Sequence, residues 1–209
     1  TPVALNLARR LIGQGRNVRF LTRGYGGRLA GPVRVDAETH TAGDVGDEAL
    51  LLARVAPAWV ARDRAHGVAA AANDAEGGPP DVIIMDDGFQ NPWVAKDRSL
   101  LVIDGGYGFG NGHVFPAGPL RESVGSALGR ADAVVLIGDD DAGIQNNLAV
   151  RGNTLPVLRA RARPGTEAGG LKGKPVVAFA GIANPEKFFQ TLREAGCEVK
   201  AAHGFADHH

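Results

Sequence analysis

The sequence lacks the features that mark secreted, membrane-spanning and nucleic-acid-binding chains. Its 209 residues include a single cysteine, Cys197, which excludes an internal disulfide framework, suits a reducing compartment and is predicted to pack in a core. No segment approaches the run of about 20 apolar residues that a membrane-spanning helix requires, and the first residues show no signal-peptide pattern. Lys and Arg (23) equal Asp and Glu (23), so the overall charge gives no reason to expect nucleic acid or a strongly anionic surface as partner. With 44% hydrophobic residues, no repeat and no low-complexity tract, the chain is predicted to fold around a substantial core.

Short apolar runs alternate with helical patterns along most of the chain. The predicted strands cover residues 17–22, 32–36, 58–61, 82–85, 100–103, 133–137, 155–163, 175–181 and 198–202, and the predicted helices cover 3–12, 48–55, 64–73, 123–130 and 185–195. This order predicts an α/β fold with a doubly wound, mostly parallel sheet of the phosphate-loop NTPase type. We expect one domain over residues 1–154, a linking strand and linker over 155–173, and the start of a second α/β domain over 174–209.

The first residues resemble the end of a phosphate-binding loop. Such a loop ends in Gly-Lys-Ser/Thr, its hydroxyl binds Mg²⁺, and the helix that follows points its N-terminus at the phosphates. Thr1 stands where this hydroxyl is expected, and apolar residues at helical spacing follow it. The pattern predicts a nucleotide enzyme whose first strand and loop lysine lie upstream of Thr1. Without that lysine and its glycines, the printed polypeptide is expected to be nearly inactive.

Two adjacent carboxylates, Asp86 and Asp87, follow four apolar residues of a predicted strand. Open α/β sheets bind ligands at the carboxyl ends of their strands, and one carboxylate there can hold Mg²⁺ beside the β- and γ-phosphates. The alternative is a pair of loop acids after an ordinary strand. Together with Thr1 and its helix, the pair favours a magnesium site.

Other polar residues stand at the ends of predicted elements, each with a structural alternative. Asp47 and Glu48 begin a predicted helix, where they stabilise its positive end; a carboxylate there could also serve a small-molecule kinase as general base. Arg23 lies in a glycine-rich turn that suits anion binding; the alternative is an ordinary turn with a solvated arginine. Arg121 and Glu122 precede another predicted helix, in a stretch that could close over a site or be simply a structured loop.

Two further patterns carry less weight. The glycines of residues 105–112 are not followed promptly by a helix, so a dinucleotide fingerprint is not supported. The terminal Asp207-His208-His209 resembles a metal cluster, from which a metal-dependent phosphoesterase is conceivable. Adjacent histidines need not face one ion, and no supporting acidic triad is evident.

Taken together, eight motifs resemble the tetraacyldisaccharide 4′-kinase (lipid A 4′-kinase) family, in that family's order across essentially the whole chain. They are Thr1-Pro2, Thr22-Arg-Gly-Tyr-Gly26, Val45-Gly-Asp-Glu48, Asp86-Asp-Gly-Phe-Gln90, Gly110-Asn-Gly112, Phe115-Pro-Ala-Gly-Pro-Leu-Arg-Glu122, Gly181-Ile-Ala-Asn-Pro185 and Phe205-Ala-Asp-His208. The Asp-Asp-Gly-Phe-Gln and Gly-Pro-Leu-Arg-Glu signatures are far more specific than a phosphate-loop remnant alone.

The resemblance implies transfer of the ATP γ-phosphate to the 4′-hydroxyl of a tetraacylated glucosamine disaccharide 1-phosphate. This reaction takes place at the cytoplasmic face of a bacterial inner membrane, so a lipid substrate and a membrane surface are the implied partners. Asp47 matches the family's catalytic base and His208 its partner from the second domain. Arg23 and Arg121 are implied anion contacts.

The same resemblance assigns the metal and nucleotide groups. It implies that Thr1 and Asp86 bind Mg²⁺, that Thr1 and Asp87 serve the nucleotide, and that Glu122 is a carboxylate near the metal. Asn91 departs from the pattern, since the family usually has histidine there. Asn keeps a hydrogen-bond donor but cannot titrate, which makes an essential acid-base role at this position doubtful.

Two other functions are also compatible with the sequence. A nucleotide-switch or partitioning NTPase would use the same loop and strand to drive a conformational change, without a small acceptor. A noncatalytic nucleotide-binding fragment would also fit a chain without the loop lysine.

Overall fold

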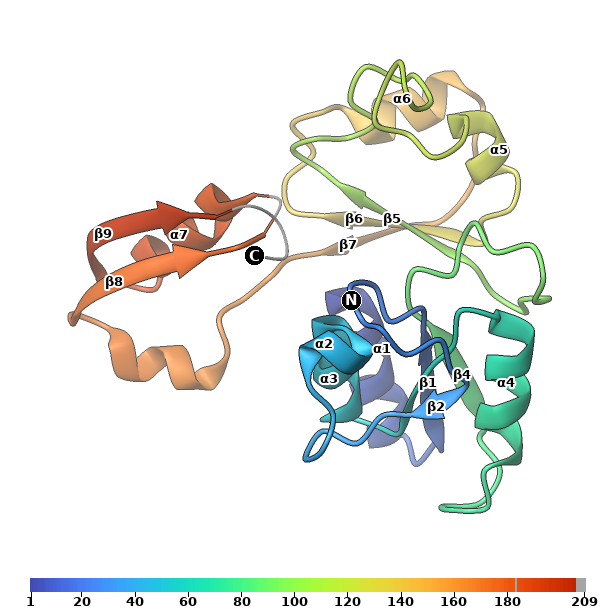
Figure 1. Ribbon diagram of the computed structural model, residues 1–209. Helices are drawn as coiled ribbons and strands as arrows, with labels where there is room; N and C mark the ends of the chain where they lie inside the picture. Colours follow the sequence, from blue (N-terminus) through green and yellow to red (C-terminus); the bar gives the residue numbers. More distant parts are fainter. Residues whose placement is uncertain (183, 206–209) are drawn as a thin grey trace. The chain divides into compact units, whose positions relative to one another are not determined.

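The computed structural model describes residues 1–182 and 184–205 (Figure 1). It divides the chain into two units, Thr1–Arg159 and Ala160–His209. The division falls inside the stretch for which the sequence predicts a linking strand and a linker, residues 155–173.

The first unit contains a four-stranded sheet in the order β2-β3-β1-β4. These strands are β1 (Val18–Thr22), β2 (Val33–Arg34), β3 (Ala58–Val60) and β4 (Val82–Met85). β1 runs parallel to both β3 and β4, whereas the short β2 pairs antiparallel with β3. Every residue of β1 is buried, as expected of a central strand covered on both faces.

Alternating side chains of β1 face two different layers of helices. Val18 and Phe20 belong to a buried cluster with residues of α1 (Pro2–Gly13) and α3 (Asp47–Ala53), whereas Leu21 packs with residues of α4 (Arg64–Asn73). Figure 1 shows α4 on one side of these strands and α1 and α3 on the other. The predicted doubly wound α/β arrangement is therefore confirmed for this sheet.

The remaining strands of the first unit form a second sheet, ordered β5-β6-β7. It comprises β5 (Leu100–Asp104), β6 (Ala133–Ile137) and β7 (Val157–Ala160), with β5 and β6 parallel. Two short helices, α5 (Val124–Leu128) and α6 (Ile144–Val150), place their apolar residues in the core of this sheet. The parallel strands are thus confirmed, and among the described residues of the first unit they are shared between two hydrogen-bonded sheets.

The second unit pairs β8 (Pro175–Ala180) in parallel with β9 (Glu198–Gly204), and α7 (Pro185–Glu194) connects the two strands. Phe189 of α7 and the free Cys197 are buried, which confirms that the thiol packs in a core. The segment predicted as a linker contains a 3-10 helix, η1 (Thr166–Leu171). Across the described part of the chain, no helix has the length and apolar character needed to cross a membrane.

Candidate active site

Thr1, at the start of α1, lies against two carboxylates from different elements. Its hydroxyl is 2.6 Å from Asp86 Oδ2, which follows β4, and it also contacts Glu48 Oε1, in the first turn of α3. The side chains of Thr1 and Asp86 are almost fully buried, with 6% and 9% exposed. The N-terminus of α1, the end of β4 and the first turn of α3 therefore meet at one place, which we call the corner and which consists of Thr1, Glu48 and Asp86. It brings Thr1 and Asp86 together as the sequence predicts.

Glu48 is the residue of this corner whose role the sequence reasoning missed. It stands next to Asp47 in the same helical turn, and both residues stabilise the positive end of α3. Successive residues on a helix point about 100° apart. Glu48 therefore reaches Thr1, while Asp47 is exposed and its Oδ1 accepts a hydrogen bond from the Glu48 amide at 2.9 Å. The signal that could have found Glu48 is its place beside the predicted base.

Asp87 points away from the corner that Asp86 enters. Its backbone has φ of 51°, in the left-handed region that aspartate tolerates better than most residues. Asp87 Oδ1 lies 2.6 Å from an Arg121 guanidinium nitrogen, and both side chains are more than half exposed. The structure thus pairs Asp87 with Arg121, and at this exposure the ion pair stabilises the fold only weakly.

Glu122 is held by a separate network. Its carboxylate accepts hydrogen bonds from Gln90 at 3.1 Å, from Ser126 at 2.9 Å and from Arg130, which contacts both oxygens. Desolvation disfavours the charged carboxylate, but these hydrogen bonds outweigh it and hold the pKa of Glu122 below its usual range. The Arg130 guanidinium also lies 5.1 Å from the centre of the Phe89 ring. Among the described residues, the hydrogen bonds of Glu122 go to this network rather than to Thr1 or Asp86.

A close contact between two glycine-rich turns positions Asp47. Gly46, with φ of 85°, precedes α3, and a Cβ at this position would lie 2.4 Å from the Tyr25 carbonyl oxygen. A Cβ at Gly27 would lie 2.7 Å from the Gly46 nitrogen. The backbones of residues 24–27 and 44–46 therefore touch, so the turn that follows Arg23 supports the start of the helix that carries Asp47.

Arg64 lies within electrostatic range of both Arg23 and Asp87. Arg64, at the start of α4, is buried, and burial lowers its pKa; the positive charge of Arg23 lowers it further, whereas Asp87 raises it. Among the residues that the structure describes, the buried Nε of Arg64 has no hydrogen-bond partner. Arg23 is exposed. The guanidinium group of Arg64 therefore places positive charge near the end of β4, with that of Arg23 close to it. The sequence reasoning treated Arg64 only as the beginning of a helix.

Asn91, which departs from the resemblance, has a structural role in its turn. Its Oδ1 accepts a hydrogen bond from the Trp93 amide at 3.0 Å, and its own amide donates to the Gly88 carbonyl at 3.0 Å. Such a side-chain to backbone bond is typical of Asn in turns.

His208, the predicted partner of Asp47, lies outside the described residues. Within residues 1–182 and 184–205, no group of three or more His, Cys, Asp and Glu side chains could hold a metal ion. A metal at the corner would therefore use a hydroxyl oxygen besides the two carboxylates.

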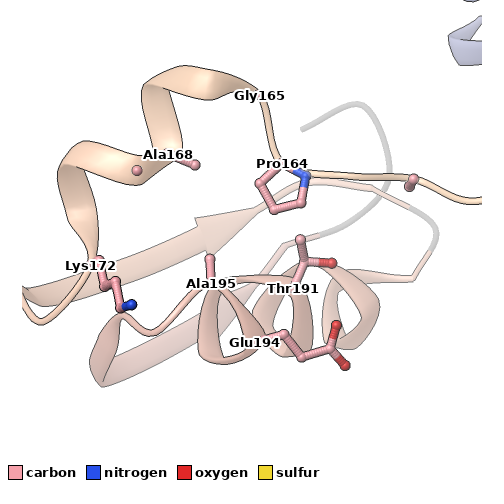
Figure 2. Close-up of a pocket in the computed structure, with 9 residues that line it drawn as sticks. Pro164, Gly165, Ala168, Lys172, Thr191, Glu194 and Ala195 are labelled. Atoms are coloured by element: carbon pink, nitrogen blue, oxygen red, sulfur yellow. The ribbon is translucent and has the colours of Figure 1, made fainter.

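The groove in Figure 2 belongs to the second unit and contains none of the predicted site residues. It has a volume of about 360 Å³ and lies between η1 and α7. Lys172, Thr191 and Glu194 are its main polar groups, and Glu194 accepts a hydrogen bond from Gln190 at 2.8 Å. These groups do not form a set that would select one class of ligand.

Comparison with known proteins decides the family. The family model for LpxK, tetraacyldisaccharide-1-P 4′-kinase, matches residues 1–209. The chain belongs to this LpxK family. The resemblance drawn from the eight motifs is confirmed.

Curated members of the LpxK family match over the full length of the chain. The tetraacyldisaccharide 4′-kinases of Paramagnetospirillum magneticum and Gluconacetobacter diazotrophicus are 55% and 56% identical to it over 209 residues. In both comparisons the match covers 100% of this chain and 62% of the relative. The chain therefore spans less than two thirds of the length of these LpxK relatives.

A solved structure supports the fold. The crystal structure described as an "apo" form of LpxK from Aquifex aeolicus in complex with ATP superposes with a TM-score of 0.71 at 24% identity. The match covers 99% of this chain and 67% of the other. At this identity the likeness establishes the α/β fold that LpxK proteins share with the chain.

Proposed function

We propose that this chain carries the nucleotide and metal side of an ATP-dependent kinase. The kinase phosphorylates the 4′-hydroxyl of a tetraacylated glucosamine disaccharide 1-phosphate in lipid A biosynthesis, at the cytoplasmic face of the bacterial inner membrane. The observation that carries the proposal is the corner of Thr1, Glu48 and Asp86, found in a chain of the LpxK family. ATP, Mg²⁺ and a lipid disaccharide are the proposed ligands, and nucleic acid has no part in the reaction.

The three oxygen-bearing groups of the corner fit Mg²⁺. One threonine hydroxyl has a single proton and cannot donate to two ionised carboxylates at once. The two carboxylates repel each other, and the Thr1 ammonium, 3.3 Å from Asp86 Oδ1, offsets only one of their two charges. Hard oxygen donors of this kind are those that Mg²⁺ prefers. Thr1, Glu48 and Asp86 would hold Mg²⁺, which when bound would neutralise charge on the β- and γ-phosphates.

Asp47 is proposed as the general base. It is exposed, so an acceptor hydroxyl can approach it, and its neighbour Glu48 belongs to the metal corner. Asp47 would accept the proton of the 4′-hydroxyl while the hydroxyl oxygen forms a bond to the γ-phosphorus and the bond to the ADP oxygen breaks. His208 is proposed to orient this carboxylate.

The guanidinium groups near the end of β4 are proposed to bind anionic oxygens. Arg64 lies within electrostatic range of both Arg23 and Asp87, and Arg121 is paired with Asp87 directly. Arginine suits phosphate because its planar donors can bind two oxygens together. Asp87 would then control the direction in which Arg121 presents its donors to the nucleotide. Glu122, held by its own network, is proposed as a carboxylate near the metal.

The test is phosphate transfer from ATP to tetraacyldisaccharide 1-phosphate by the product of the full gene that contains this sequence, with products resolved by mass. Asp47→Asn is expected to lower turnover by about 10²- to 10⁴-fold while ATP binding is kept. Asp63→Asn is the matched control, because asparagine also caps a helix N-terminus and Asp63 is the N-cap of α4. Unchanged turnover in Asp47→Asn would exclude Asp47 as the base. ATP hydrolysis without transfer would favour a nucleotide-switch NTPase instead.

A further inference from the structure

The loop of residues 105–119, between β5 and Leu120, has an unusual composition. It contains no Asp, Glu, Lys or Arg, although these residues make up 22% of the chain. His113 is its one basic residue. We refer to residues 105–119 as the aromatic loop, because it contains Tyr107, Phe109 and Phe115.

The aromatic loop has an attached side and an exposed side. Phe109, together with Leu120 directly after the loop, packs against the core of the second sheet. In contrast, Tyr107 is 63% exposed, Val114 40% and Phe115 79%. Exposed apolar groups that gather on one element, rather than singly, are typical of interaction sites.

The exposure does not result from a loose loop. The Asn111 side-chain amide donates to the Ala117 carbonyl at 2.9 Å, and the Phe115 amide donates to the Leu120 carbonyl at 2.8 Å. A Cβ at Gly118 would lie 2.4 Å from the His113 carbonyl oxygen, so the two sides of the loop are in backbone contact. Internal bonds therefore fix a shape that keeps the rings of Tyr107 and Phe115 in water.

We propose that the aromatic loop contacts the surface of a phospholipid bilayer and places the rings of Tyr107 and Phe115 at the boundary of headgroups and acyl chains. Aromatic side chains favour this boundary, and a loop without carboxylates is not repelled by anionic lipids. The inference rests on the proposed function. The loop leads directly into Arg121 and Glu122, which contact Asp87 and Gln90. A site that phosphorylates the headgroup of a tetraacylated lipid must have a rim that reaches the bilayer.

The test is flotation of the purified 209-residue chain with unilamellar vesicles of phosphatidylethanolamine and phosphatidylglycerol, without nucleotide or acceptor. The chain is expected to float with the vesicles, and Phe115→Ser to lower the partition coefficient by about tenfold, because burial of one phenylalanine contributes at least that factor. Phe115→Trp should keep the binding. Its additional emission, taken as the difference from the parent that contains Trp59 and Trp93, should shift to the blue and be quenched by brominated lipid.

The matched control is Phe179→Ser, since Phe179 of β8 is 71% exposed but belongs to the second unit. It should leave the partition coefficient unchanged. The proposal is overturned if the chain does not float, if Phe115→Ser floats like the parent, or if Phe179→Ser lowers binding equally. Thermal unfolding of each variant checks that it is folded. Because the assay contains no ATP, its failure is distinct from failure of the kinase proposal.

Discussion

Gly46 directly precedes Asp47, the proposed base, and its replacement by alanine should destabilise the first unit strongly. Its φ and ψ of 85° and 150° lie in a region that is essentially restricted to glycine, and forcing another residue into it costs about 1–3 kcal/mol. In addition, the new Cβ would lie 2.4 Å from the Tyr25 carbonyl oxygen, where only a backbone shift could relieve the contact. Together these effects should lower the free energy of unfolding by about 3 kcal/mol.

Thermal unfolding followed by circular dichroism measures the effect. A loss of about 3 kcal/mol lowers the midpoint by roughly 6–12 °C in a protein of this size. Gly43→Ala is the control, three residues earlier in α2 (Ala42–Val45), because its nearest neighbouring atom is 3.7 Å away and its φ is not positive. That substitution should be neutral or slightly stabilising. Equal midpoints for Gly46→Ala and Gly43→Ala would refute the argument from backbone contact.

Three further outcomes follow from the structure. Glu48→Gln should weaken Mg²⁺ binding to the ATP-bound full-length protein by about tenfold or more, measured by magnesium titration of nucleotide binding; an unchanged titration would remove Glu48 from the metal corner. Leu21→Ala, at a fully buried position, should cost about 2–5 kcal/mol of unfolding free energy in urea, whereas Leu51→Ala, at a position 46% exposed, should cost far less. Arg130→Gln should raise the lowered pKa of Glu122 toward its usual range. A lowered carboxylate pKa stabilises the fold above the unfolded value of about 4.3, and this contribution is lost as pH falls through the folded pKa. The variant should therefore be less stable than the parent at pH 7, and the difference should shrink as pH falls through the folded pKa of Glu122. A constant difference in midpoint from neutral to acidic pH would contradict the assignment.

The strands of the first unit could be predicted well because burial on both faces requires unbroken apolar runs. The predicted bounds of Val82–Met85 and Ala133–Ile137 are those of β4 and β6. The 10-residue helix Arg64–Asn73 was also predicted with its observed bounds, since Asp63 is a strong N-cap. Local signals of this kind act within one element and need no knowledge of tertiary contacts.

Short helices were harder to predict because their apolar pattern is brief. In α6 only Ile144 and Leu148 are buried, on either side of two asparagines, and the polar stretch hides their spacing of four residues. The helix η1 occupies a segment whose glycines and proline favour a linker. In both segments, contacts with the rest of the fold override a weak local preference.

Arg19 shows why a charged residue can stand inside a buried strand. Its guanidinium lies 5.4 Å from the centre of the Trp59 ring and donates to the carbonyls of Asp74 at 3.1 Å and Glu76 at 3.0 Å. It also reaches the Ala71 carbonyl at the end of α4. The loop after α4 thus supplies carbonyl acceptors that compensate for burial of the guanidinium charge. The sequence of the strand itself does not indicate these partners.

The apolar run of β4 predicted two carboxylates at the end of the strand, but this local pattern alone did not distinguish Asp86 from Asp87. In a regular strand, consecutive side chains would alternate across the sheet, and both could be equivalent loop acids. The left-handed backbone of Asp87 breaks that regularity, so Asp86 enters the buried corner beside Thr1 while Asp87 turns to Arg121 in solvent. One turn therefore joins the proposed metal corner to the segment that begins with Arg121. Since the aromatic loop leads into that same arginine, the strand end connects the chemistry proposed for phosphate transfer with the surface proposed to meet the lipid.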